Sequence, residues 1–436
     1  MSADHCGFVT RLSNLAPHDN ADKLQLCVVF NNQVVISKDM YEGQMVLYVP
    51  TDMRLSEEFC VENKLLKSLG GYIDDKKRNV TTVKLRGQRS DGLVLPIECL
   101  SAFTDISKLK PGDRISTLNG KEIITKYVPA GRNKNRSEKS GVRKTPSKKL
   151  AERFPLFKEH VDTLQFDFNL DVFKPYDEII ITEKLEGTSG RTSYNDTIVD
   201  KPQNWVQKKL NQILRKPTPT EIVKRYVTGT RRTVLTDFNG GFYGSDLFRK
   251  TFHDDLEQND KLYKGETIYY EIVGFLPDGR PIMPSHNNKK VNDKEFQRIY
   301  GEQTVFSYGC EPKKCKMFVY RMTMNTGEIE IEYPWQLVKL RCEQMGLETV
   351  PELDHYMFTT VENTCARVEA LLSKPSVIDG SHIAEGVCVR RNNATSFSCL
   401  KKKCWEYKAL ISIYKSEDNE PDIEEQESAV EGGETV

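Results

Sequence analysis

The stretch ITEKLEGTSGR, residues 181–191, places Lys184 at the end of a β-prone run, beside carboxylates and ahead of two glycines. A lysine amine attacks an electrophile only when it is neutral, so a reactive lysine needs surroundings that favour loss of its proton. Glycines let a backbone approach a phosphate closely. The stretch therefore predicts a lysine that attacks a nucleotide. Lys-x-Glu-Gly alone also arises by chance, so the rest of the chain has to decide.

Four further clusters on β-prone runs follow this lysine in chain order. A carboxylate ends one run before a glycine, aromatic residues alternate along the next, a second carboxylate opens an apolar run, and lysines occupy alternate positions of the last. They are Glu271; Phe318 and Tyr320 with Arg321; Glu385 with Val387 and Cys388; and Lys401 to Lys403 ahead of Cys404 and Tyr407. Each charge taken singly is more simply a solvated strand end, so only the combination indicates a site.

The N-terminal part, residues 7–125, is expected to form a small β-barrel. Strands are predicted at residues 24–30, 33–37, 44–49, 81–85 and 93–97, with a helical insert at 56–68. Residues 20–24 and 85–92 resemble the OB-like tRNA-binding domains of some aminoacyl-tRNA synthetases. OB barrels bind single strands through cationic and aromatic groups, so Arg86 and Arg89 are candidates for RNA contacts. Solvated charges at a strand end are the equal alternative.

Residues 150–415 mix strand-like and helix-like patterns. Strands are predicted at residues 178–183, 267–273, 316–324, 327–333, 386–390 and 407–412, and amphipathic helices at 205–214, 245–256, 335–345 and 361–372. The chain contains no Rossmann glycine pattern and no GxxxxGK[ST] motif. Its phosphate chemistry is therefore neither of the dinucleotide nor of the P-loop type.

The order lysine, carboxylate, aromatic, carboxylate, lysine pair closely resembles motifs I, III, IIIa, IV and V of the covalent nucleotidyltransferases. These comprise RNA ligases, DNA ligases and mRNA capping enzymes. The stretches at residues 229–232 and 248–250, with Arg231 and Arg249, are similar to ATP-dependent RNA ligases and make these arginines candidates for RNA contacts. An OB-like module ahead of the catalytic domain is similar to the Naegleria and Deinococcus type, the fifth RNA ligase family. The resemblance covers nearly all of residues 7–412.

This resemblance implies an α+β fold: an OB-like β-barrel, then a nucleotidyltransferase domain of ATP-grasp-like antiparallel sheets plus helices. It implies that Lys184 attacks the α-phosphate of ATP, and that Lys401 and Lys403 neutralise that phosphate and help to lower the pKa of Lys184. Three successive lysines leave the register of this pair open by one, although Cys404 and Tyr407 favour Lys401 with Lys403.

The resemblance also implies the nucleotide and metal contacts. Tyr320 or Phe318 would stack on adenine, with Val387 or Cys388 on its other face, and Glu183 would accept from the adenine amino group. Glu271 and Glu385, supported by Glu186, would hold Mg²⁺ or Mn²⁺ directly or through water. AMP would then pass to an RNA 5′-phosphate, and a 3′-hydroxyl would displace it. Nicked duplexes with a 3′-hydroxyl RNA end are the expected substrate, and broken RNA ends the broader class.

The formal net charge of zero conceals a strong asymmetry. Residues 416–436 hold nine acidic side chains and no basic one, which leaves residues 1–415 nine charges positive. A basic body suits a polyanion such as RNA, and the tail either competes with that ligand or is a solubilising end. We expect an OB-like RNA-binding domain at 1–128, a basic linker at 129–150, the nucleotidyltransferase domain at 151–415 and the acidic tail at 416–436. The linker is a tether, a phosphate-tracking segment or a nuclear-import signal.

No long apolar run and no signal-peptide pattern is present, so a monomeric protein of the cytoplasm or the nucleus, with no membrane partner, is expected. The eleven cysteines are then expected to be reduced, since the two Cys-x4-Cys pairs have poor spacing for zinc. Two alternatives to a ligase remain. One is a capping guanylyltransferase, which normally carries an OB domain after motif V, and the other is a non-catalytic RNA-binding protein with a degenerate transferase fold.

Overall fold

The computed structural model of the 436-residue chain describes residues 5–127, 152–214, 216–291 and 293–417. The predicted basic linker lies outside the described residues, and so does the acidic tail from residue 418 on. The domain boundaries at these segments therefore stay a prediction. No helix among the described residues is long and apolar enough to cross a membrane. The eleven cysteines are free thiols.

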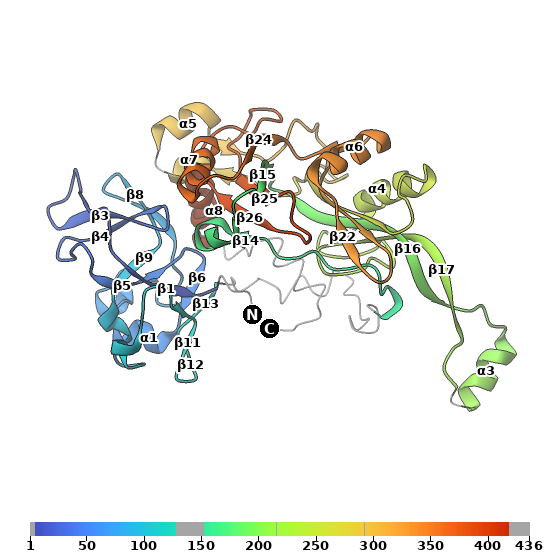
Figure 1. Ribbon diagram of the computed structural model, residues 1–436, viewed down its shortest axis with the longest axis horizontal. Coiled ribbons are helices and arrows are strands. Elements are labelled where there is room, and N and C mark those ends of the chain that lie inside the picture. Colours follow the sequence, from blue (N-terminus) through green and yellow to red (C-terminus); the bar gives the residue numbers. More distant parts are fainter. Residues whose placement is uncertain (1–4, 128–151, 215, 292, 418–436) are drawn as a thin grey trace.

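An N-terminal module of short strands occupies one end of the molecule (Figure 1). Its main sheet has the order β10-β1-β5-β9, a second sheet the order β2-β3-β4, and three pairs join β7 to β8, β6 to β13 and β11 to β12. The strands are β1 (Gly7–Arg11), β2 (Ala16–Pro17), β3 (Leu24–Val29), β4 (Asn32–Ser37), β5 (Met45–Val49), β6 (Met53–Leu55), β7 (Thr82–Leu85), β8 (Gln88–Asp91), β9 (Leu93–Pro96), β10 (Arg114–Ile115), β11 (Thr117–Leu118), β12 (Lys121–Glu122) and β13 (Ile124–Lys126).

The five strands predicted for this module are confirmed to within one or two residues. The helical insert is shorter than predicted. α1 (Glu57–Glu62) is capped by Asn63, and only a 3-10 turn, Lys67–Leu69, follows. Two apolar clusters fill the module, one beneath α1 and one around Phe8, Val34 and Tyr48. Phe168, from the following domain, packs against the second cluster. The two parts of the chain thus share a core.

The C-terminal part of the chain, as far as the structure describes it, contains two larger sheets. The first has the order β14-β26-β25-β15-β24 and the second the order β17-β16-β18-β21-β22, with β23 also paired to β21. The strands are β14 (Leu164–Gln165), β15 (Glu178–Lys184), β16 (Thr188–Asp200), β17 (Thr220–Gly229), β18 (Glu266–Gly274), β21 (Cys315–Asn325), β22 (Glu330–Glu332), β23 (Glu348–Thr349), β24 (Glu352–Met357), β25 (Gly386–Arg391) and β26 (Cys399–Lys403), with the small pair β19 (His286–Asn287) and β20 (Gln303–Thr304). One large apolar core packs between the elements of this part.

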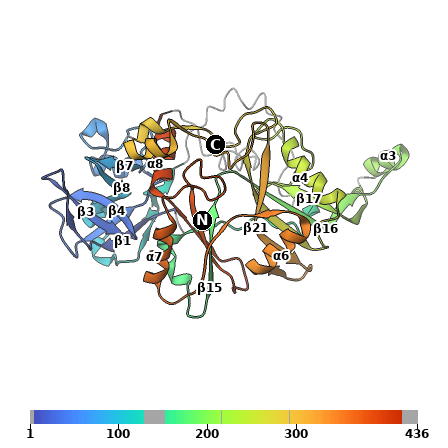
Figure 2. The same cartoon turned by 90° about the horizontal axis from the view of Figure 1, so that it is seen from above.

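Among the described residues, six α-helices accompany these sheets: α3 (Trp205–Ile213), α4 (Leu247–Gln258), α5 (Lys294–Tyr300), α6 (Trp335–Met345), α7 (Val361–Leu371) and α8 (Trp405–Glu417). The predictions for α3, α4, α6 and α7 are confirmed. The predicted strand at residues 407–412 is wrong, because this segment lies inside α8. Tyr407 and Leu410 are buried three residues apart, which is a helical spacing, and they join the core from one face of α8. In Figures 1 and 2, α8 lies against the N-terminal module, and the β16–β17 hairpin carries α3 away from the opposite end.

Burial of His286 makes the stability of this fold sensitive to pH. The side chain is 6% exposed, and burial lowers its pKa to about 4. The pKa of an unfolded histidine is about 6.5. Between this pH and pH 4, the unfolded chain therefore binds a proton at residue 286 that the folded chain does not bind. The free energy of unfolding should therefore fall as pH drops from about 6.5 towards 4.

Urea unfolding at pH 7.5 and 5.5 checks this prediction in the parent chain and in His286→Gln. The parent should lose roughly 1 kcal/mol more between these pH values than the variant, which has no proton to bind there. Equal losses in both proteins would contradict the assignment of the effect to His286.

Candidate active site

Strand register brings three of the predicted lysines to one face of the first sheet. Lys184, the last residue of β15, pairs with Gly386 of β25, which pairs in turn with Lys403 of β26. Cys388 pairs with Lys401 in the same way. Side chains two residues apart on a strand share a face, so Lys401 and Lys403 both project on the side of Lys184.

A buried carboxylate holds two of these lysines. Glu385 is wholly buried, its Oε2 lies 2.7 Å from Lys184 Nζ, and its Oε1 lies 3.0 Å from Lys403 Nζ. Burial alone would raise the pKa of Glu385. Lys184 and Lys403 lower this pKa by more than burial raises it, so it lies below its usual value. Glu385 is therefore ionised at neutral pH and fixes the two ammonium groups around one point.

The middle lysine of the triplet faces the other way. Lys402 is 5% exposed, and its Nζ lies 2.7 Å from Asp167 Oδ1 and 2.9 Å from Glu369 Oε1. The register that the sequence left open by one is thus Lys401 with Lys403. Gly386 permits the close approach of β26, because a Cβ at this position would collide with the Lys402 carbonyl oxygen.

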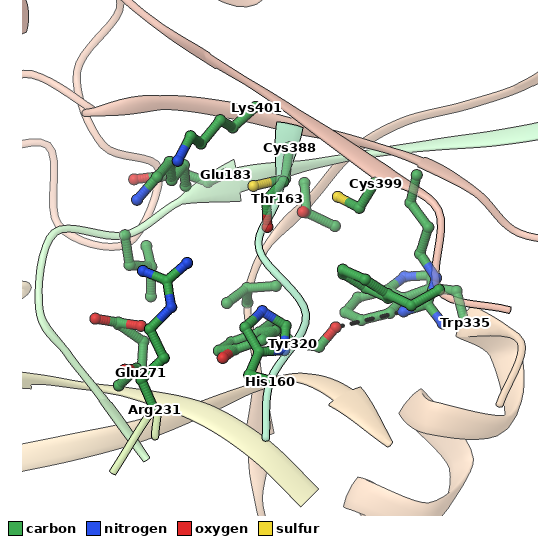
Figure 3. A pocket seen from close by; sticks show the side chains of 17 residues that line it. His160, Thr163, Glu183, Arg231, Glu271, Tyr320, Trp335, Cys388, Cys399 and Lys401 are labelled. Atoms are coloured by element: carbon green, nitrogen blue, oxygen red, sulfur yellow. Dashed lines mark hydrogen bonds between the residues drawn. The ribbon is translucent and has the colours of Figure 1, made fainter. Parts of the chain in front are cut away.

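A cavity opens beside Lys184 between the two sheets. Its lining contains seven of the predicted residues: Glu183, Lys184, Arg231, Glu271, Tyr320, Cys388 and Lys401. Figure 3 shows Lys401 and Cys388 on one wall, Tyr320 on the facing wall, and Arg231 with Glu271 at one end. Basic groups and an aromatic ring facing one space match what a nucleotide requires, namely compensation of phosphate charge and a stacking surface for the base.

His160 also lines this cavity, although nothing in the sequence marks it. Its ring lies edge-on to Tyr320 at 5.3 Å and to Phe397 at 5.4 Å. Burial and then Arg321 lower the pKa of His160 well below its usual value, so the ring is neutral. An isolated histidine ahead of the catalytic motifs carries no spacing signal, and only the fold places it in the cavity.

Glu183 presents an acceptor inside the cavity. The residue is 2% exposed, and its Oε2 accepts a hydrogen bond from the Val377 amide at 3.0 Å. Its Oε1 is buried and has no hydrogen-bond partner among the described residues. Burial raises the pKa of Glu183, and the nearby Ser376 hydroxyl only partly offsets this. A buried acceptor that lacks a donor favours a ligand that brings one.

The three carboxylates predicted to hold a metal do not gather at one point. The part of the chain that the structure describes contains no group of three or more metal-binding side chains. Glu385 is occupied by two lysines, and Glu186 accepts a hydrogen bond from the Tyr407 hydroxyl instead of lining the cavity. Glu271, 8% exposed, does line it. The donor set fits a cation held by Glu271 together with substrate phosphates and water, and does not fit an all-protein cage.

For the two pairs of alternatives expected to contact the base, the structure shows which residue of each pair lines the cavity. Tyr320 and Cys388 line the cavity, whereas Phe318 and Val387 are 2% and 1% exposed and belong to the apolar core. Phe318 pairs with Glu348 of β23 at the edge of β21, and Val387 faces away from Cys388 along β25. Phe318 and Val387 are therefore structural residues.

The four arginines proposed for RNA have different surroundings. Arg86 is exposed at the β7–β8 turn, and Arg231 lines the cavity with an ion pair to Asp162 at 2.5 Å. Arg89 forms an ion pair with Glu406 and lies over the Trp405 ring. The prediction for Arg249 is wrong. This side chain is wholly buried, because it pairs with Asp246 at 2.6 Å and donates to Thr188 at 2.6 Å.

The two sheets therefore carry the lysine, the carboxylates, the aromatic ring and the lysine pair in the arrangement of a covalent nucleotidyltransferase. Comparison with known proteins narrows this class. Residues 177–404, more than half of the chain, match the family model described as RNA ligase, and residues 7–97 match a model described as an OB-fold domain. The chain belongs to the RNA ligase family, with an OB-fold region at its N-terminus.

Solved structures of the RNA ligase of Naegleria gruberi have the same fold. A mutant bound to AMP and Mn gives a TM-score of 0.57 at 15% identity over 93% of this chain and 98% of that chain. The enzyme with PPi gives 0.57 at 15% over 92% and 97%, and an apo mutant gives 0.57 at 16% over 94% and 98%. No curated protein matches the chain. The predicted α+β class with an N-terminal OB-like barrel is confirmed.

Arg249→Met tests the structural role assigned to Arg249. Removing one partner of this buried ion pair takes a cation away from the buried Asp246 carboxylate, which should cost about 3–5 kcal/mol of stability. Lys250→Met is the matched control, since Lys250 pairs with Asp254 at the surface and should change stability by less than ~1 kcal/mol. Urea unfolding of both variants checks the prediction. A stable Arg249→Met protein with weakened RNA binding would restore the RNA-contact role.

Proposed function

We propose that this protein is an ATP-dependent RNA ligase that joins RNA 3′-hydroxyl and 5′-phosphate ends through lysyl-AMP and RNA-adenylate intermediates. The observation that carries the proposal is the arrangement of Lys184. Its ammonium lies 2.7 Å from buried Glu385, shares that carboxylate with Lys403, and borders an aromatic cavity. A structural lysine would not need a second cation on the same buried carboxylate.

In the first step, neutral Lys184 Nζ attacks the α-phosphorus of ATP. A nitrogen–phosphorus bond forms while the bond to the bridging oxygen breaks, and pyrophosphate leaves. Glu385 orients the amine, and Lys401 and Lys403 supply positive charge where the α-phosphate gains negative charge. The same neighbouring cations favour the neutral form of the attacking amine.

The base would lie against Tyr320, with Cys388 on the opposite wall of the cavity. Glu183 Oε1 would accept from the 6-amino group of adenine, which supplies the donor that this buried oxygen lacks among the described residues. Guanine carries a carbonyl oxygen at that position, and two acceptors facing each other without a proton are unfavourable. The cavity therefore favours ATP over GTP.

A divalent cation, Mn²⁺ or Mg²⁺, would supply charge compensation for the leaving pyrophosphate, and Glu271 is the cavity carboxylate that would hold it. AMP then passes from Lys184 to an RNA 5′-phosphate, and a 3′-hydroxyl displaces AMP as the phosphodiester forms. Membership of the RNA ligase family supports RNA as the substrate. We propose nicked duplexes with a 3′-hydroxyl RNA strand as the preferred form, and a monomer as the active unit. Arg86 and Arg231 are the exposed and cavity-lining arginines placed to contact this RNA.

The covalent step is tested with α-labelled ATP and Mn²⁺ or Mg²⁺, followed by a denaturing gel. The parent chain should retain label, and Lys184→Ala should retain none, because the label is bonded to that side chain. Lys339→Ala, which removes a surface lysine paired with Glu352, should label as the parent does. Full labelling or RNA sealing by Lys184→Ala would refute the mechanism.

Nucleotide choice is tested with Glu183→Gln. The amide can donate to the guanine carbonyl, so the preference for ATP over GTP in labelling should fall by about tenfold or more. Glu178→Gln is the control, since Glu178 lies on the same strand but pairs with His355 outside the cavity. An unchanged preference in Glu183→Gln would remove Glu183 from base recognition.

A further inference from the structure

Two segments attach the strand that carries the lysine pair to the N-terminal module, both at the C-terminal end of that strand. β26 pairs with β25 on one edge and with the two-residue strand β14 on the other, where Gln165 meets Lys401. Residues just after β14 and just after β26 contact the module. These attachments lie behind the lysine pair, on the side away from the cavity.

The first attachment runs through Asp167. One oxygen of this carboxylate accepts from Lys402 at 2.7 Å, and the other accepts from the Asn32 side chain at 3.2 Å. Asn32 begins β4 of the module, is 7% exposed, and is held by its own hydrogen bond to the Phe30 carbonyl at 2.9 Å. A continuous polar chain thus joins the module to the residue between the two site lysines.

Phe168 fixes this attachment in place. Its ring stacks on Phe8 at 4.4 Å and meets Phe30 edge-on at 5.4 Å, inside an apolar cluster of the module. Its carbonyl accepts from Arg114 at 3.2 Å. Because Asp167 and Phe168 are neighbours in sequence, burying the ring in the module also fixes the position of the carboxylate under Lys402.

The second attachment follows β26 directly. Trp405 opens α8 and lies under the guanidinium of Arg89 at 4.6 Å, and Glu406 forms an ion pair with the same arginine. Lys408 forms an ion pair with Asp91, at the end of β8. α8 packs beside β7 of the module, as Figure 2 shows. Two sets of contacts with the N-terminal module therefore hold the end of β26 at which Lys403 lies.

These contacts matter because three successive lysines make the pairing register of β26 against β25 ambiguous. A slip of one residue against β25 would turn Lys402 towards the cavity and turn Lys401 and Lys403 away from it. Only the observed register gives the buried Lys402 its ion-pair partners Asp167 and Glu369. Leaving a buried ammonium without a partner is strongly unfavourable, so this pairing discriminates against the slip.

We propose that the N-terminal module positions the lysine pair for the first chemical step, with Asp167 as the positioning residue that acts through Lys402 and is held by Asn32. The inference rests on the proposed function and adds a role in positioning catalytic groups to a module whose expected role is RNA binding. It predicts that adenylylation of Lys184, which requires no RNA, depends on contacts made by the module.

The test uses the full-length chain with Asp167→Asn, and Asp171→Asn as the matched control. Asp171 lies four residues further on, is exposed, and forms no ion pair in the described residues. The rate of Lys184 labelling at saturating ATP should fall about tenfold or more in Asp167→Asn and stay at the parent value in Asp171→Asn. RNA binding, measured by fluorescence anisotropy with a labelled nicked duplex, should change less than about twofold in both.

Two readouts separate positioning from general damage. Displaced cations disfavour the protonated form of the Lys184 amine less, so the acid limb of the pH–rate profile for labelling should move to higher pH in Asp167→Asn. Asp167→Asn should also add nothing to Lys402→Met in the double variant, because both act through one contact. Asn32→Leu, which removes the link to Asp167 together with the hydrogen bond to the Phe30 carbonyl, should slow labelling while Lys402 keeps its ion pair with Asp167.

The outcomes distinguish the two proposals. Parent-rate labelling by Asp167→Asn, additive losses in the double variant, or loss of RNA binding in proportion to labelling would each overturn the positioning role and leave the ligase proposal standing. Absence of label from the parent chain would overturn both. A labelling defect in Asp167→Asn with a shifted acid limb and intact RNA binding would establish the role.

Discussion

The ion pairs of Glu385 are the constraint on which the site depends. A carboxylate with no exposed surface must be compensated, and here the compensation comes from Lys184 on one neighbouring segment and Lys403 on another. Removing both lysines would leave an uncompensated charge in the core, so folding and the placing of the reactive amine depend on the same ion pairs. Glycine at 386 completes this arrangement, since any larger residue would push β26 away from β25.

The second sheet is tied to this point by the crossover after Lys184. Glycine at 187 passes the Ile272 carbonyl so closely that a Cβ would collide with it. β16 then pairs with β18, which sets Ser189 opposite Glu271 and brings that carboxylate to the cavity. The spacing between the reactive lysine and the candidate cation ligand is therefore fixed by backbone pairing and not by flexible side chains.

Much of this site could be predicted because its residues occupy alternate positions on short strands. Lys184, Glu271, Tyr320 and Lys401 were recognisable from order and spacing, and all four line the cavity. The β16–β17 hairpin escaped prediction because its buried face is polar. Thr192, for example, is fully buried and hydrogen-bonds to Thr228 and Tyr270. A strand with a threonine-lined interior has no hydrophobic alternation to detect.

Contacts between sequence-distant segments account for the other differences. Burial of Arg249 could not be predicted, because its partner Thr188 lies 61 residues away in the sequence. The same limit applied to Lys402, whose orientation is decided by Asp167 across the sheet. A basic residue in a motif is thus equally consistent with substrate binding and with a buried ion pair. Only the fold shows that Lys184, Lys401 and Arg231 line the cavity, whereas Lys402 and Arg249 are buried in ion pairs.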